Sequence, residues 1–124
     1  MKLEFGYGNG IQTVTVPDKN VMGVLVSNEM THERCGEAAV RYALAEPIGA
    51  PTLRTLAKLG QKIAIIASDI SRPVPSYEIL PAILDELAAA GCRREDVTIV
   101  FALGSHRHHT EEEMQHLAGS AVYD

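Results

Sequence analysis

The chain has 124 residues, of which 46% are hydrophobic, and this suits one globular domain spanning residues 1–124. A net charge of -5, an aromatic content of 5% and the lack of tryptophan disfavour a nucleic-acid surface, which needs clustered basic side chains and stacking rings. No apolar stretch approaches the roughly 20 residues that span a bilayer, and the N-terminus does not resemble a signal peptide. Cys35 and Cys92 are far apart and are expected to be free thiols, so we expect a cytoplasmic protein without membrane or nucleic-acid partners.

The first 26 residues contain three candidate strands. Residues 3–7 and 11–16 flank Gly8-Asn9-Gly10, a turn sequence that tolerates positive φ angles. This pattern predicts a β-hairpin. Residues 21–26 are apolar and β-branched, and they predict a third strand.

Helical periodicity begins after this segment. Residues 33–46 predict one helix and residues 52–59 a shorter one that ends at Gly60. Residues 76–90 predict a third helix, which either begins at Pro81 or is kinked in its first turn. A fourth helix is expected to open at Thr110, where Glu113 completes a capping box.

Two apolar runs flank the third helix. Residues 62–67 are almost continuously apolar, which is typical of a strand covered on both faces, and residues 97–101 form a second such run. Together with the helix they predict a βαβ unit with parallel strands and a right-handed crossover. The expected fold class is therefore α/β: a three-layer-like domain with a parallel βαβ core (strands about 62–67 and 97–101) plus an N-terminal β-hairpin.

The segment SDISRP follows the first of these strands and carries Asp69 and Arg72. It leads into a helix N-terminus, where free N–H groups favour an anion. The sequence therefore predicts that Arg72 and this loop hold a phosphate or a carboxylate. The alternative is a local ion pair between Asp69 and Arg72 that fixes the loop.

The segment GSHRHHTEEE follows the second strand, so His106 is expected at the same rim as Arg72. An imidazole is the natural proton acceptor at neutral pH, and a solvated loop histidine is the alternative. His106, His108 and His109 also resemble a metal cluster, but no second group of ligands completes it, so we expect no metal site formed by this chain alone. The glutamates at 111–113 fit helix capping.

These two motifs, together with the helix LPAILDELAAAG and the leading YGNG turn, resemble the N-terminal domain of the lactate racemase family. The resemblance extends over nearly the whole chain, in the same order of elements. It implies an isomerase that racemises or epimerises 2-hydroxy acids with a nickel-pincer nucleotide cofactor. By the same resemblance, Asp69, Ile70, Ser71 and Arg72 form the loop that binds the cofactor, Arg72 helps to hold the substrate carboxylate, and His106 is a catalytic histidine that takes the hydroxyl proton.

The chain also departs from the family pattern. The family's second catalytic histidine, the lysine bonded to the cofactor and the nickel-ligating histidine have no counterpart here, and His108 stands where proline is common. The resemblance therefore implies the N-terminal part of a longer enzyme, inactive alone, whose partner is a C-terminal domain. Two alternatives stay open: a non-catalytic module that binds an anionic metabolite, and a metal-binding domain built on the histidine cluster.

Overall fold

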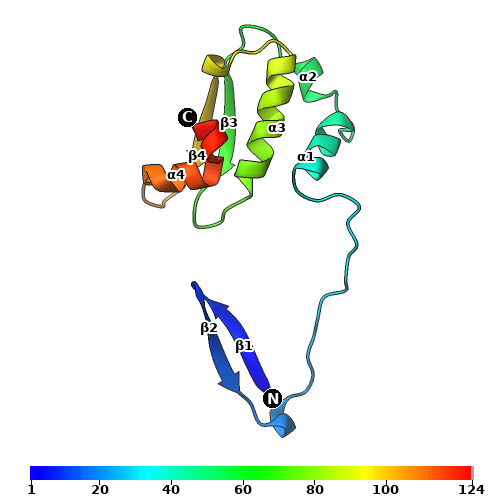
Figure 1. Cartoon of the computed structure of the whole chain (residues 1–124), viewed down its shortest axis with the longest axis vertical. Helices are drawn as coiled ribbons and strands as arrows, with labels where there is room; N and C mark the ends of the chain where they lie inside the picture. The colour runs from blue at the N-terminus through cyan, green and yellow to red at the C-terminus, as the bar shows by residue number, and fades with distance from the viewer. Residues whose placement is uncertain (124) are drawn as a thin grey trace. The chain divides into compact units, whose positions relative to one another are not determined.

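The computed structural model describes residues 1–123, which divide into two compact units, Met1–Thr31 and the part that begins at His32 (Figure 1). Each unit has its own elements. None of the helices in the described residues has the length and hydropathy of a membrane-spanning segment.

The first unit is built on an antiparallel hairpin. Strands β1 (Lys2–Tyr7) and β2 (Gly10–Thr15) pair from Lys2 opposite Thr15 to Tyr7 opposite Gly10. The turn between them needs a left-handed residue, and Gly8 supplies it with a φ of 56°. The predicted hairpin is thus confirmed; a single 3-10 turn, η1 (Asp18–Asn20), follows it.

The third strand predicted for residues 21–26 is wrong, because these residues form neither a strand nor a helix. The apolar side chains of Met22, Val24, Leu25 and Val26 are exposed, and Leu25 is fully so. A β-branched sequence becomes a strand only when another strand accepts its backbone hydrogen bonds, and no strand of the described residues does this.

The second unit starts with two helices, α1 (Gly36–Ala45) and α2 (Leu53–Leu56). The first lies inside the range expected from the sequence. The second is shorter than predicted because Ala57 is already extended, with a ψ of 144°. The backbone N–H of Lys58 then donates to the side chain of Gln61, which closes a turn in place of further helix.

The centre of this unit is the predicted βαβ arrangement. Strand β3 (Ile63–Ser68), helix α3 (Ser76–Ala89) and strand β4 (Val97–Ala102) follow in order, with a short 3-10 turn η2 (Arg94–Asp96) before β4. The two strands are parallel and pair in register from Ile63 opposite Val97 to Ser68 opposite Ala102. Helix α3 already begins at Ser76 and continues through Pro81. The mixed α/β fold class is confirmed.

The core lies between one face of the two-stranded sheet and the helices. Helix α4 (Glu111–Ala118) and the short α5 (Ser120–Tyr123) pack with α3. The fully buried side chains Leu80 and Leu117 come from α3 and α4. The second face of the sheet is open within the described residues: Ile66 is 75% exposed, although the sequence predicted cover on both faces. A continuous apolar run does not distinguish cover by its own chain from cover by another element.

Candidate functional site

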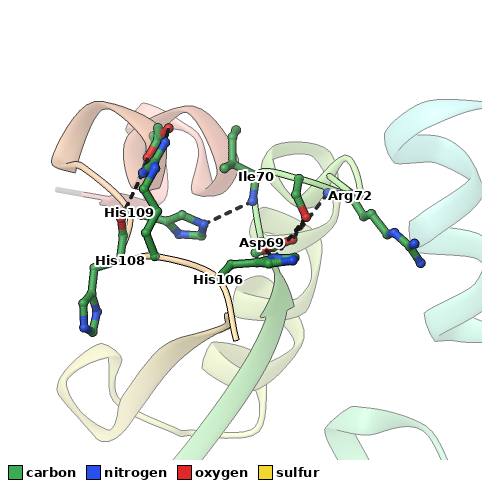
Figure 2. Close-up of polar contacts among 9 residues, drawn as sticks. Asp69, Ile70, Arg72, His106, His108 and His109 are labelled. Atoms are coloured by element: carbon green, nitrogen blue, oxygen red, sulfur yellow. Dashed lines mark hydrogen bonds and ion pairs between the residues drawn. The ribbon is translucent and has the colours of Figure 1, made fainter. Parts of the chain in front are cut away.

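The site forms where β3 and β4 end. Because the strands are parallel and Ser68 pairs with Ala102, the loops that follow them leave the sheet at the same rim. The loop of residues 69–75 carries Asp69 and Arg72, and the loop of residues 103–110 carries His106 (Figure 2). The expectation that the two motifs converge is confirmed.

Asp69 and His106 are in direct contact across the two loops. The Nδ1 atom of His106 lies against Oδ2 of Asp69, and Ser71 Oγ donates to Asp69 Oδ1 at 2.8 Å. Asp69 is only 5% exposed. The hydrogen bond with His106, followed by that from Ser71, lowers the pKa of Asp69 to about 2. The carboxylate is therefore ionised at neutral pH and acts as an acceptor.

This contact determines which nitrogen of His106 carries the proton. An ionised carboxylate accepts only, so Nδ1 carries a hydrogen, and in the neutral ring Nε2 keeps its lone pair. The His106 side chain is 56% exposed, so a ligand in the rim has access to the ring. An imidazole held in this tautomer is suited to take a proton from a substrate hydroxyl.

Arg72 is placed at the same rim but makes no ion pair with Asp69. Its backbone N–H donates to Asp69 Oδ1 at 3.3 Å, while its side chain points away from His106 (Figure 2). The local ion pair considered from the sequence is thus absent. Arg72, Asp69 and His106 line one open hollow of about 570 Å³, together with Gly104 and Ser105. Within residues 1–123 the guanidinium pairs with no acidic side chain, so it is available to an anion in that hollow.

The three histidines of the second motif do not gather around one point. His108 points away from the other two, whereas His109 lies toward Ile70 and accepts its backbone N–H at Nε2, at 3.1 Å (Figure 2). No group of three or more metal-ligating side chains occurs in the part of the chain that the structure describes. The geometry therefore gives no support to the metal-cluster alternative.

Sequence reasoning missed two contacts that hold the His106 loop. Arg107 forms a forked ion pair with Glu113, with nitrogen–oxygen distances of 2.6 and 2.8 Å. Glu113 also accepts the backbone N–H of Thr110 in the capping box, which confirms the predicted helix start. The capping pattern was visible in the sequence, but nothing in the spacing indicated that Arg107 would join it. The hydrogen bond of His109 likewise depends on a residue 39 positions away.

We expect the free energy of unfolding to fall as the pH is lowered from about 4.5 toward 2. The pKa values of Asp69, Asp96 and Glu113 are each lowered to about 2, from 3.8, 3.8 and 4.5. The main causes are hydrogen bonds with His106, Arg93 and Arg107 respectively. In this range the unfolded chain binds these protons and the folded chain does not, so acid favours unfolding.

Urea unfolding at a series of pH values measures this dependence. Asp96 offers a test away from the rim, since it is buried and held by Arg93 and Lys62. The variant Asp96→Asn should show a shallower fall than the unmodified chain between pH 4 and pH 2, because one of the three carboxyls no longer titrates. An unfolding free energy that is independent of pH in this range would contradict the assignment.

Known proteins are similar to this chain over nearly its whole length. The sequence model of the family described as the lactate racemase N-terminal domain matches residues 7–124. The lactate racemase of Thermoanaerobacterium thermosaccharolyticum is 36% identical over 115 residues, which cover 91% of this chain and 27% of that protein. The lactate racemase of Lactiplantibacillus plantarum is 34% identical over 122 residues, which cover 97% of this chain and 28% of that protein.

A solved structure shares the fold as well. The lactate racemase apoprotein from T. thermosaccharolyticum matches with a TM-score of 0.72 at 36% identity, and the match covers 98% of this chain and 28% of that one. The chain thus spans little more than a quarter of the length of these relatives. Because the family model matches nearly the whole length of this chain, the chain belongs to the lactate racemase N-terminal domain family.

Proposed function

We propose that this chain forms one wall of the active site of a 2-hydroxy-acid racemase or epimerase, an isomerase. Membership of the family supports the reaction class. The observation that carries the proposal is the contact of Asp69 with His106 at a rim that also contains an unpaired Arg72. A 2-hydroxy acid needs a base for its hydroxyl proton and a cation for its carboxylate, and these two side chains supply both.

In this proposal His106 is the acid and base. Its Nε2 takes the proton of the substrate hydroxyl as the C2 hydrogen leaves, and it returns that proton to the same oxygen when the hydroxy acid forms again. Asp69 keeps Nδ1 protonated and stabilises the imidazolium that exists in between. Arg72 binds the carboxylate in a charge-assisted hydrogen bond, which orients C2 toward the rim. Because the keto acid formed in between is planar at C2, either enantiomer is accessible.

The family's nickel-pincer nucleotide fits the chemistry of the loop of residues 69–72. Ser71 and Arg72 are exposed there and offer a hydroxyl and a guanidinium to an anionic nucleotide. We propose that Asp69, Ile70, Ser71 and Arg72 hold this cofactor from one side. When bound, the cofactor supplies the acceptor for the hydride from C2. Its lysine attachment and nickel ligands would come from residues outside this chain.

We further propose that residues 1–124 act as the N-terminal domain of a longer enzyme and are inactive alone. The length of the relatives supports this, since the chain covers 27% and 28% of them. The remaining part would supply the opposite wall and would determine which 2-hydroxy acid is accepted. A cytoplasmic location is also part of the proposal; both cysteines are free thiols, as expected in a reducing compartment.

The variant Arg72→Ala tests the carboxylate role. In a polypeptide that carries this chain and extends to the length of its relatives, here called the full-length protein, we expect kcat/KM for lactate to fall by a factor of about 10 to 100, since a charge-assisted hydrogen bond is lost. Arg54→Ala is the matched control, because Arg54 pairs with Glu86 away from the rim. Unchanged kcat/KM in Arg72→Ala, measured by chiral chromatography, would reject the assignment.

A binding module without catalysis is the second candidate, and the unpaired guanidinium of Arg72 favours it. It predicts that the 124-residue chain alone binds lactate or phosphate and that Arg72→Ala abolishes this binding. Isothermal titration calorimetry of the chain with each anion measures it. Anion binding by the chain, combined with a full-length protein that takes up cofactor but does not racemise, would favour this candidate over the enzyme.

A further inference from the structure

His109 connects the two loops that form the site. Its ring belongs to the loop after β4, but Nε2 accepts the backbone N–H of Ile70 in the loop after β3, at 3.1 Å (Figure 2). The same ring packs edge-on against Phe101, with ring centroids 5.4 Å apart and an interplanar angle of 76°. Because Phe101 belongs to β4, this packing holds the His109 ring against the sheet, with Nε2 directed toward the loop after β3.

The hydrogen bond to Ile70 determines which ring nitrogen of His109 carries the proton. A nitrogen that accepts an N–H carries no proton of its own, so the proton of the neutral ring is on Nδ1. Within the described residues, Nδ1 is buried and has no hydrogen-bond partner. The bond to Ile70 and the contact with Phe101 are the interactions that hold the ring within the described residues.

Ile70 lies between the two residues of its loop that contact His106. Asp69 precedes it and Ser71 follows it, and both approach Nδ1 of His106. A fixed N–H at Ile70 therefore limits the positions that the Asp69 carboxylate and the Ser71 hydroxyl adopt. His106 and His109 are three residues apart in one loop, and both contact the loop that carries Asp69, Ile70 and Ser71.

We propose that His109 is a positioning residue. By accepting the backbone N–H of Ile70, it holds the loop of residues 69–72 against the loop of His106, and it thereby keeps the Asp69 carboxylate in contact with the imidazole of His106. The catalytic meaning of this role rests on the proposed function, but the contact itself does not. His108 is the natural control. It is the adjacent histidine, it is exposed, and it points away from both loops (Figure 2).

Three variants of the 124-residue chain separate the hydrogen bond from packing. His109→Leu keeps an apolar side chain against Phe101 but offers no acceptor, His109→Gln provides an amide oxygen in place of Nε2, and His108→Ala leaves the connection intact. In His109→Leu we expect the amide of Ile70 to exchange with deuterium about tenfold faster, which corresponds to the loss of one hydrogen bond. The Nδ1 proton signal of His106 should broaden or disappear in the same variant. Both signals should return in His109→Gln and stay unchanged in His108→Ala.

A measurement on the unmodified chain covers the case in which His109→Leu fails to fold. Nitrogen-15 spectra of the ring should show a protonated Nδ1 and an unprotonated Nε2 for His109. A proton on Nε2 would overturn the proposal, and so would an Ile70 amide that keeps its protection in a folded His109→Leu chain. All of these signals are independent of turnover. A full-length protein without racemase activity would therefore count against the proposed function and leave the role of His109 intact.

Discussion

Replacing His106 by alanine in the full-length protein is expected to lower kcat for lactate racemisation by a factor of about 10² to 10⁴, the usual contribution of a general acid and base. The reason is local: within the rim, His106 is the histidine whose ring is half-exposed and held by an ionised carboxylate. His109, the other histidine in contact with the same loop, uses its Nε2 to accept a backbone N–H and is not available for a substrate.

The fold should survive this change, because the His106 side chain is 56% exposed and belongs to a loop rather than to the core. Circular dichroism and the urea midpoint of the variant test this directly. The matched control is His108→Ala, since His108 is two residues away and its side chain points away from His106 and His109 (Figure 2). Full racemase activity in His106→Ala, or an equal loss in His108→Ala, would exclude the acid–base role.

The variant Asp69→Asn should produce a loss of similar size, about a thousandfold or more in kcat, by a different route. The change keeps the shape of the side chain but removes its charge, and the new amide is able to donate toward Nδ1 of His106. The ring then favours the tautomer with its proton on Nε2, which leaves no base at the rim; comparable substitutions beside catalytic histidines cost about 10⁴ in kcat. Asp69 is buried and ionised, with a pKa of about 2, so the effect should be present throughout the neutral range.

Measurements of kcat and of the His106 tautomer together identify this mechanism. In Asp69→Asn the nitrogen-15 spectrum of His106 should show the proton on Nε2, whereas the unmodified protein should show it on Nδ1. The control Asp85→Asn changes an aspartate on the exposed side of α3, where it pairs with Arg41, and should leave both kcat and the tautomer unchanged. A large loss of kcat without a change of tautomer would mean that Asp69 acts through another group.

The parallel core was predictable because its signals are local. Three signals define the βαβ unit: the apolar run before Ser68, the helical stripe with Leu80 and Leu87, and the glycine at 91. The right-handed crossover then leaves one arrangement of the two strands and the helix. That arrangement in turn places Asp69 and His106 at the same rim. The capping box of Thr110 and Glu113 is equally local, and it was predictable for the same reason.

The features that sequence did not predict all depend on a distant partner. In the described part of the chain, residues 21–26 have the composition of a strand but no neighbouring strand to pair with. Ile66 is an apolar residue of a continuous apolar run, but no layer of the described residues covers it. Asp69 had two possible partners, Arg72 nearby in the sequence and His106 in the loop after β4. The structure pairs it with His106, because the parallel register brings that ring over the carboxylate.

A crystal structure of the full-length protein with a bound 2-hydroxy acid tests the central claim most directly. We expect the substrate hydroxyl within about 3 Å of Nε2 of His106, in hydrogen-bond range for proton transfer, and the carboxylate on the guanidinium of Arg72. A bound hydroxy acid that contacts neither side chain, with His106 still held by Asp69, would contradict the account.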